Sequence, residues 1–316
     1  KVRSVVTNKC RWAGYRGFGK EVASYFMDRV LDRIADATGV DRVAVRLRNF
    51  IPADAFPYSQ VSGALFDSGN YQGAMEKLLT QVDVGEFRKQ QAKARNDGRL
   101  LGIGFGFEVT PEGASMPNND MLQGYDGVTI RMDPMGRVTV LTGVTSPGSG
   151  NETGIAQIVA DTLGVSLDTV SVVQGDTDRC PYGLGNFSSR SLMIGGSAAY
   201  LAAQDVRAKL IKVAGRLLQA APEELNSGGG EIYVENAPDK RVTIKNVART
   251  IYRHVFGPHV EDMEPGIEVT RYFRIGNVYH QPETQGRFNP YPTWPFMASA
   301  AVVEVDRETG FVKVLK

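Results

Sequence analysis

Three glycine-containing loops carry hydroxyl, amide or guanidinium groups close to where helices are expected to begin. The first loop, residues 14–19, presents Arg16 and Phe18, and the second, residues 148–151, reads Gly-Ser-Gly-Asn. The third loop ends in Ser-Ser-Arg-Ser at residues 188–191. Unpaired backbone N–H groups at a helix start bind anions, because the positive end of the helix dipole lies there too. These residue types at this spacing therefore predict anion-binding loops.

The second loop connects an expected strand to an expected helix. Gly148 and Gly150 leave its backbone bare, and Asn151 is a residue type that caps helices. The helix is expected to bury an apolar face made of Ile155, Ile158, Val159 and Leu163. A plain strand-to-helix turn is the alternative interpretation, and both stay open on the residues of this loop alone.

The first loop matches part of a nucleotide-binding P-loop, since Gly14, Gly19 and Lys20 fit the spacing G-x-x-x-x-G-K. Glu21 stands where that motif needs a hydroxyl for Mg²⁺, and its carboxylate would repel the phosphates. We therefore reject the P-loop. What remains is the guanidinium of Arg16, which can bind an anion, beside an aromatic ring two residues later. A tight turn with one core aromatic residue is the alternative.

The third loop offers a second anion site of the same physical kind. Its last four residues, 188–191, precede a long helix whose expected buried face is made of Ala202, Val206, Leu210, Val213 and Leu217. Asp176 and Asp178 lie earlier in the same segment. We interpret them as turn-capping residues, because no third metal ligand is close to them in sequence.

The composition argues against several classes of partner. The 316 residues have a formal net charge of +1 and are 42% hydrophobic, so nucleic acid is not expected as a partner. No apolar run reaches the length of a membrane span, and no secretion signal is recognised. Cys10 and Cys180 supply neither a disulfide framework nor the ligands of an iron–sulfur cluster, and the three histidines lack metal-ligand spacing. A cytoplasmic location is expected and no metal ligand is assigned.

Helical and strand periodicities together predict an α+β fold. Helices are expected at about 20–38, ending at Gly39, at 42–49, and at 71–95 with an interruption near 84–85. The first helix carries apolar residues at Val22, Tyr25, Phe26, Val30, Ile34 and Ala37. Strands are expected at 101–109, 128–132, 138–142 and 169–173, with a terminal hairpin at 303–314.

A set of short motifs resembles the large, molybdopterin-binding subunit of the xanthine oxidase, aldehyde oxidase and aerobic carbon monoxide dehydrogenase family. Each motif is short, and their order along nearly the whole chain carries the resemblance. The motifs lie at residues 15–19, 48–51 with 56–58, 67–71, 148–153 with 157–161, 175–178, 189–191 and 303–306.

The resemblance implies the end of a first molybdenum-cofactor domain at residues 1–81, a helical connection at 82–99, and an incomplete second cofactor domain at 100–316. By alignment in order, the chain is expected to start after the family's first glycine-rich cofactor loop. It is expected to stop before the segment with the family's catalytic glutamate. No catalytic residue is therefore assigned within these 316 residues.

Carried over residue by residue, the resemblance implies that Arg16 contacts the pterin and that Phe18 stacks on a heterocyclic substrate. It places the loop of 148–151 beside the metal and the loop of 188–191 at the pterin phosphate region. The implied cofactor-binding residues are Arg16, Gly17, Gly148, Ser149, Gly150, Asn151, Asn186, Ser188, Ser189, Arg190 and Ser191.

Some of these residues depart from the family pattern. Ser149 replaces a usual Gln, and a short Ser hydroxyl cannot reach as far as a Gln amide, which puts the contact near the metal in doubt. Asn151, Asn186 and Ser188 replace a usual His, Thr and Gly. Gly17 occupies the position of the copper-binding cysteine of carbon monoxide dehydrogenases, so carbon monoxide is not expected as the substrate.

The activity that the resemblance implies is oxidation of an aldehyde or N-heterocycle, with oxygen from water and two electrons passing to a molybdenum cofactor. The cofactor is molybdopterin, with a cytosine dinucleotide as one possible form. Iron–sulfur (2Fe-2S) and FAD subunits and the remaining parts of the large subunit are expected as partners, because this chain lacks their ligand sets. The alternative is a non-catalytic cofactor-binding or scaffold fragment, which Ser149 and the missing glutamate favour. In both cases the isolated chain is expected to be inactive.

Overall fold

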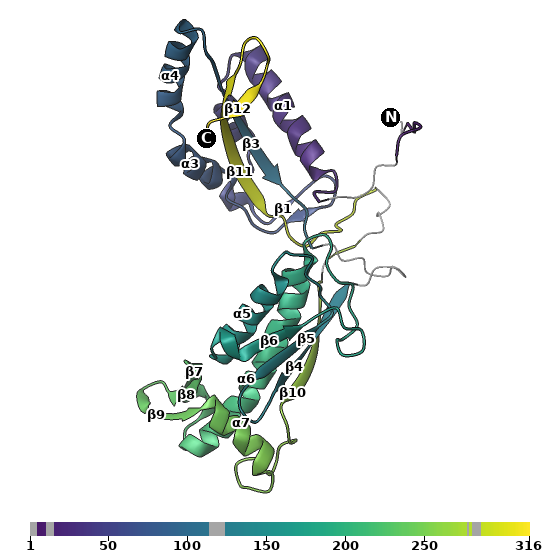
Figure 1. The fold of residues 1–316 in the computed structure, drawn as a ribbon, viewed down its shortest axis with the longest axis vertical. Helices are drawn as coiled ribbons and strands as arrows, with labels where there is room; N and C mark the ends of the chain where they lie inside the picture. The colour runs from purple at the N-terminus through teal and green to yellow at the C-terminus, as the bar shows by residue number, and fades with distance from the viewer. Residues whose placement is uncertain (1–4, 11–15, 114–123, 277, 280–285) are drawn as a thin grey trace. The chain divides into compact units, whose positions relative to one another are not determined.

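The computed structural model describes residues 5–10, 16–113, 124–276, 278–279 and 286–316, which form two compact units (Figure 1). The first unit takes its described residues from 1–59, 65–111 and 294–316, and the second takes them from 60–64 and 112–293. The chain thus returns to the first unit at its C-terminal end.

In the first unit, helices cover both faces of a small antiparallel sheet (Figure 1). The sheet has the order β12-β11-β3, with Val303 of β11 opposite Val314 on one side and Gly102 on the other. Its core contains Val43, Met75, Phe87, Ile103 and Phe105. The elements are α1 (Lys20–Thr38), α2 (Arg42–Asn49), η1 (Ala53–Ala55), β1 (Tyr58–Ser59), β2 (Leu65–Phe66), α3 (Tyr71–Gln81), α4 (Val84–Asn96), β3 (Leu100–Val109), β11 (Phe296–Val305) and β12 (Val312–Val314).

The second unit is built on a mixed sheet with the order β10-β4-β5-β6, in which only the β5–β6 pair is parallel. Helices α5 and α6 pack against this sheet and against each other. A separate sheet has the order β7-β8-β9. The elements are β4 (Tyr125–Met132), β5 (Val138–Thr142), α5 (Asn151–Leu163), η2 (Leu167–Thr169), β6 (Val170–Val173), η3 (Ser191–Gly195), α6 (Gly196–Leu218), η4 (Pro222–Glu224), β7 (Leu225–Gly228), β8 (Glu231–Val234), β9 (Ala237–Thr243), α7 (Ile244–Arg253) and β10 (Glu268–Arg274).

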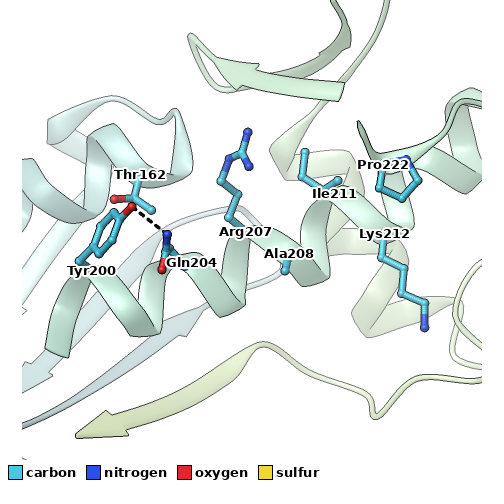
Figure 2. Close-up of a pocket in the computed structure, with 8 residues that line it drawn as sticks. All are labelled: Thr162, Tyr200, Gln204, Arg207, Ala208, Ile211, Lys212 and Pro222. Carbon is cyan, nitrogen blue, oxygen red and sulfur yellow. Dashed lines mark hydrogen bonds between the residues drawn. The ribbon is translucent and has the colours of Figure 1, made fainter. Parts of the chain in front are cut away.

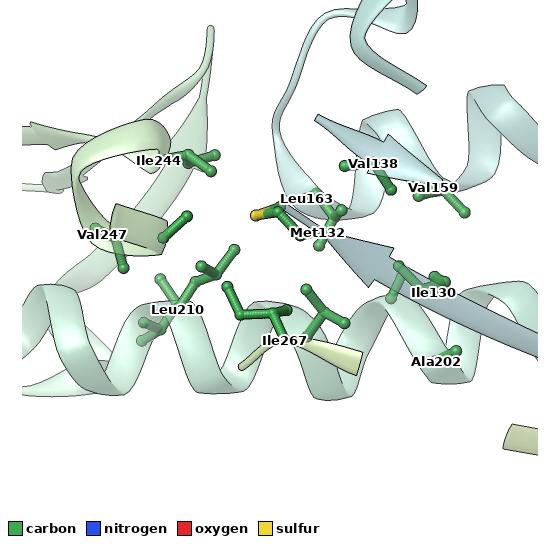
Figure 3. Packing of buried hydrophobic residues seen from close by; sticks show 14 of the residues in the cluster. Ile130, Met132, Val138, Val159, Leu163, Ala202, Leu210, Ile244, Val247 and Ile267 are labelled. Atoms are coloured by element: carbon green, nitrogen blue, oxygen red, sulfur yellow. The ribbon is translucent and has the colours of Figure 1, made fainter. Parts of the chain in front are cut away.

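The core of the second unit joins the mixed sheet to α5, α6 and α7 (Figure 3). Alternate residues of β4, Val128, Ile130 and Met132, are fully buried, as expected for a strand with one face on a core. They meet side chains from α6, such as Ala202 and Leu210. This packing gives the loops at the end of β5 and before α6 a rigid base.

Most predicted elements are confirmed, and so is the α+β class. Helix α1 ends at Gly39, whose φ of 71° is the left-handed conformation that glycine adopts readily. Helix α2 has the predicted bounds, and Asp41 caps it by accepting hydrogen bonds from the backbone of Val43 and Ala44. The predicted interruption of the long helix separates α3 from α4, where Asp83 caps the second helix.

Most of the large apolar residues of α1 lie outside its buried face. Val22, Tyr25, Phe26 and Ile34 are between 45% and 69% exposed within the described structure. The face that packs on the unit instead carries Asp28, Asp32 and Ala35, with Asp32 and Ala35 buried. These carboxylates turn inward because Arg46 of α2, itself 0% exposed, forms ion pairs with both.

The compact units do not follow a linear order along the chain. Strand β3 pairs along its whole length with β11, from Leu100 opposite Val305 to Val109 opposite Phe296. Both strands therefore belong to the first unit, although the sequence places them after residue 99. The predicted domains at 1–81 and 100–316 are domains of the family sequence and differ in kind from these compact units. Their boundaries stay a prediction.

Candidate functional site

The loop that follows β5 ends at Gly150, which takes the N-cap position of α5 with a φ of 72°. The prediction that Asn151 caps this helix is wrong. Asn151 is the first helical residue and is buried, and its side-chain amide donates to the carbonyl oxygen of Thr145 at 2.9 Å. Asn151 therefore connects the start of the helix to the preceding loop by a hydrogen bond.

The first turn of α5 already carries a negative charge of its own. The pKa of the Glu152 carboxyl lies below its ordinary value, because its own backbone N–H and the Ser146 hydroxyl donate hydrogen bonds to it. A free phosphate at this helix start would meet that like charge. The loop suits a ligand with neutral hydrogen-bonding atoms better than it suits a bare dianion.

Asn186 connects the second and third predicted loops. Its side-chain amide donates to Ser149 Oγ at 3.3 Å, and the hydroxyl of Ser191 donates to its Oδ1 at 2.8 Å. Beside this link, Gly148 and Gly150 have positive φ and open space where a Cβ would stand. The structure therefore brings two of the three predicted loops to one place in the second unit.

The third loop is held in an unusual backbone conformation. Ser188 and Ser189 have φ values of 47° and 54°, in the left-handed region. For residues with a side chain this conformation costs roughly 1–2 kcal/mol per residue, so surrounding contacts must hold it. One such contact is the backbone N–H of Gly113, which donates to the carbonyl oxygen of Ser188 at 2.8 Å. Ser189 is exposed, and its hydroxyl can meet a ligand.

The guanidinium of Arg190 points into the protein. It is 0% exposed, its Nη1 lies 2.5 Å from Oδ2 of the equally buried Asp126, and its Nη2 donates to the carbonyl oxygen of Tyr125 at 3.0 Å. It also lies 5.2 Å from the ring centre of Phe187. The structure thus shows this side chain engaged with β4, and direct contact with a cofactor stays a prediction.

Burial raises the pKa of Asp126 to about 6, because loss of water outweighs the attraction of Arg190 and the backbone N–H of Leu184. Asp126 was not among the residues predicted from the sequence. The available signal was a carboxylate at the start of a strand whose alternate residues are apolar, with Gly127 after it. That signal alone does not say whether the carboxylate points to the core or to water.

Arg16, Gly17 and Phe18 lie in the turn before α1, in the first unit. Gly17 and Phe18 have φ values of 93° and 53°. Phe18 is 78% exposed, so it lies outside the core of the described structure, and its role as a substrate platform stays a prediction. Arg16 is also exposed, and both side chains are accessible to a ligand or to another polypeptide.

A hollow of about 760 Å³ lies away from these loops, along α6 (Figure 2). Its cation Arg207 is engaged by Ser227 and Asn226, at 3.1 Å and 3.2 Å. Its lining residues are Thr162, Tyr200, Gln204, Arg207, Ala208, Ile211, Lys212 and Pro222. None of them belongs to the predicted cofactor set.

Within the described ranges, no group of three or more His, Cys, Asp or Glu side chains is arranged to hold a metal ion. No helix in that part of the chain is both long and apolar enough to cross a membrane.

Family models described as molybdopterin cofactor-binding domains match residues 1–50 and 77–316. The carbon monoxide dehydrogenase large chain of Afipia carboxidovorans is 32% identical over 99% of this chain and 38% of its own length. The nicotine 6-hydroxylase large subunit of Paenarthrobacter nicotinovorans is 30% identical over 98% of this chain and 36% of its own length.

The fold is similar to that of solved relatives as well. The crystal structure of quinoline 2-oxidoreductase from Pseudomonas putida 86 matches with a TM-score of 0.83 and 29% identity, over 97% of this chain and 38% of that chain. This chain therefore spans well under half the length of the relatives that it matches.

Proposed function

Because this chain belongs to the molybdopterin cofactor-binding family, we propose that it forms part of the cofactor site of a molybdenum hydroxylase. The observation that carries the proposal is the link through Asn186, which joins the loop of 148–151 to the loop of 188–191 inside the matched region. The relatives named above are large subunits or chains of oxidoreductases, which supports the same reaction class.

The residues present fit a molybdopterin by their chemistry. Ser149, Asn186 and Ser189 supply hydroxyl and amide groups that donate and accept, while Gly148 and Gly150 leave backbone accessible. These five residues would hold the pterin. When bound, the molybdenum centre would supply two-electron oxidation of the substrate with oxygen from water. The pterin form, with or without a cytosine dinucleotide, belongs to the same proposal.

Arg16 and Phe18 supply the second half of the proposal. An exposed aromatic ring two residues from an exposed guanidinium suits a flat heterocycle, because the ring can stack on it. We assign Phe18 as the substrate platform and Arg16 as a pterin contact. Gly17 lacks the thiol that copper would need, so an aldehyde or N-heterocycle fits better than carbon monoxide.

The partners in this proposal are the remaining parts of the large subunit and subunits with 2Fe-2S and FAD. The exposed face of α1 supports the first of these, since Val22, Tyr25 and Phe26 are 57%, 69% and 64% exposed. Neighbouring apolar side chains of this size, left open on one helix face, mark an interaction surface. The cytoplasmic location stays a prediction.

A second candidate, holding the cofactor without turnover by this chain alone, is favoured by Ser149. Its hydroxyl accepts a hydrogen bond from Asn186 and thus serves the link between the two loops. A role in linking loops needs no contact with the reacting atoms. No general base is assigned in this chain under either candidate function.

Asn186→Ala tests the proposal in the protein purified with its native partners. Two hydrogen bonds of about 1 kcal/mol each are lost, so molybdenum and pterin per polypeptide should fall by roughly tenfold. The matched control is Gln204→Ala, which removes an exposed amide bonded to Tyr200 and should leave the cofactor content unchanged.

The same preparation separates the two candidate functions. Wild-type protein that contains neither molybdenum nor pterin would overturn the cofactor proposal. Cofactor at wild-type level together with no oxidation of aldehydes or N-heterocycles by the assembled complex would favour the non-catalytic alternative.

A further inference from the structure

The ion pair between Asp126 and Arg190 joins the candidate cofactor loop to the central sheet. Asp126 is the second residue of β4, and both side chains are 0% exposed, with 2.5 Å between Oδ2 and Nη1. The guanidinium also holds the carbonyl oxygen of Tyr125, the first residue of the same strand. Arg190 thus attaches its loop to two consecutive residues of a rigid strand.

The hydrogen-bonding groups of this ion pair are only partly satisfied. Within the described residues, Nε and Nη1 of Arg190 and both carboxylate oxygens of Asp126 make no hydrogen bond of good geometry, although Nη1 and Oδ2 lie 2.5 Å apart as an ion pair. A buried arginine that serves stability alone is expected to have all its N–H groups paired. Arg190 is therefore a buried arginine whose hydrogen bonding is incomplete.

The backbone beside Asp126 is packed too closely for any side chain. A Cβ at Gly183 would lie 2.6 Å from Asp126 Oδ1 and 2.7 Å from the Cα of Gly143, at the end of β5. The N–H of Gly185 donates to the carbonyl oxygen of Gly143 at 3.2 Å. The segment leading into the third loop is therefore pressed against Asp126 on one side, while Arg190 holds the carboxylate on the other.

The contacts of Gly185 and Arg190 lie at the two ends of the segment whose residues are proposed to face a ligand. Between Gly185 and Arg190 lie Asn186, which links the two loops, and Ser188 and Ser189 in their left-handed conformation. With both ends of this short segment attached to the sheet, the conformations between them are restricted. Release of the Arg190 end would let the two serines return to ordinary backbone angles.

We propose that Asp126 is a positioning residue of the cofactor site, which acts through Arg190 to hold residues 186–191 in the conformation that binds the pterin. The cofactor part of this inference rests on the proposed function. The positioning part concerns the loop and the sheet alone, and it holds for any ligand of this loop.

Asp126→Asn removes the charge and keeps the shape of the side chain. Hydrogen exchange of the backbone amides of 186–191 should become at least tenfold faster, while amides of β4 and β5 such as Ile130 and Val140 keep their protection. Molybdenum and pterin per folded polypeptide should fall by at least tenfold. Unchanged exchange in 186–191 would overturn the proposal.

A double variant separates positioning from stability. Asp126→Leu combined with Arg190→Met replaces the buried pair by apolar side chains of similar size, a change that often preserves or raises stability. We expect a melting temperature near that of the wild type together with fast loop exchange and low cofactor content. Recovery of both loop protection and cofactor content would show that the pair only fills space, and would overturn the proposal.

Asp205→Asn is the matched control, because Asp205 forms an ion pair with Arg271 on the surface of the same unit. It should change neither the exchange of 186–191 nor the cofactor content. Failure of the proposed function would be visible as absence of molybdenum and pterin from the wild type. The exchange measurement on the protein as isolated still decides the positioning role in that case.

Discussion

Arg46 in the first unit and Arg190 in the second are both fully buried, yet their surroundings differ. Arg46 donates to the carboxylates of Asp28 and Asp32 and to the carbonyl oxygens of Arg42 and Phe105. Arg190 has one carboxylate and one carbonyl oxygen, and its Nε is left without an acceptor in the described structure.

The difference follows from what each arginine connects. Arg46 joins two helices to β3, and Asp28 also accepts from the backbone N–H of Phe107 at 3.2 Å. Arg46 is therefore the centre of a hydrogen-bonded network of charged groups. This network, not apolar packing, fills the contact between the two helices. Arg190 holds a loop of the candidate site in which two serines have left-handed backbone angles, and its own hydrogen bonding is incomplete. Two arginines with the same exposure can therefore have different roles.

The largest expected effect is that of Arg46→Ala on stability. The substitution leaves Asp28, which is 17% exposed, without its cation, and leaves Asp32, which is 9% exposed, with the more exposed Arg29 and Arg42 as its partners in the described structure. Breaking a buried ion pair from one side costs about 3–5 kcal/mol, so the free energy of unfolding of the first unit should fall by about that amount. Denaturant unfolding followed by hydrogen exchange in β3 measures it.

The control for this prediction is Arg42→Ala on the same helix. Arg42 is 34% exposed and pairs with Asp36 and, at 3.6 Å, with Asp32; its removal leaves Asp32 paired with Arg46 and should cost less than about 1 kcal/mol. Equal losses for the two variants would contradict the picture of Arg46 as the centre of the network.

The second prediction concerns the pH dependence of stability that the buried pair of the second unit causes. Folded Asp126 binds its proton at about pH 6, against an ordinary value of 3.8, so the folded chain binds more protons between these values. The protonated Asp126 therefore makes its full contribution to the free energy of unfolding below about pH 4. This contribution is lost as the pH rises through 6, and the loss is at most about 3 kcal/mol.

The measurement is the difference between wild type and Asp126→Asn, taken from pH 4 to pH 7. The difference cancels other carboxylates, such as Glu304 and Asp306, whose pKa values lie below their ordinary range and which act with the opposite sign. The wild type should lose stability relative to the variant as the pH rises. A constant difference would show that Asp126 keeps one charge state over this range.

The smallest expected effect on stability is that of Phe18→Ala, on the turn before α1. Because the ring is 78% exposed, its removal should change the free energy of unfolding by less than about 0.5 kcal/mol. In the assembled enzyme, kcat/KM for aromatic heterocycles should fall more than for small aldehydes, since a stacking contact adds about 0.5–1.5 kcal/mol.

Phe87→Ala gives the matched core comparison, because Phe87 is 6% exposed and packs in the first unit. It should cost about 3–5 kcal/mol and affect all substrates alike through loss of folded protein. If Phe18→Ala destabilises the first unit as strongly, the turn belongs to the core and is not a substrate platform.

Much of the fold could be predicted from the sequence, because its signals are local. Gly39 ends α1 through its left-handed backbone, and Asp41 and Asp83 begin α2 and α4 by capping free N–H groups. Short motifs in family order also indicated the molybdopterin cofactor-binding family, which the family models confirm. The loop of 148–151 and the loop of 188–191 were identified from residue types alone.

Only the tertiary structure decided which side chains face inward. Tyr25 and Phe26 are apolar residues of α1 and are exposed, whereas Arg46 draws Asp28 and Asp32 of the same helix inward. The resemblance implies that Arg190 contacts the cofactor, which stays a prediction, and only the structure shows that its guanidinium pairs with Asp126, 64 residues earlier. The reason is physical: a charge is buried only where an opposite charge meets it, and that partner can lie anywhere along the chain.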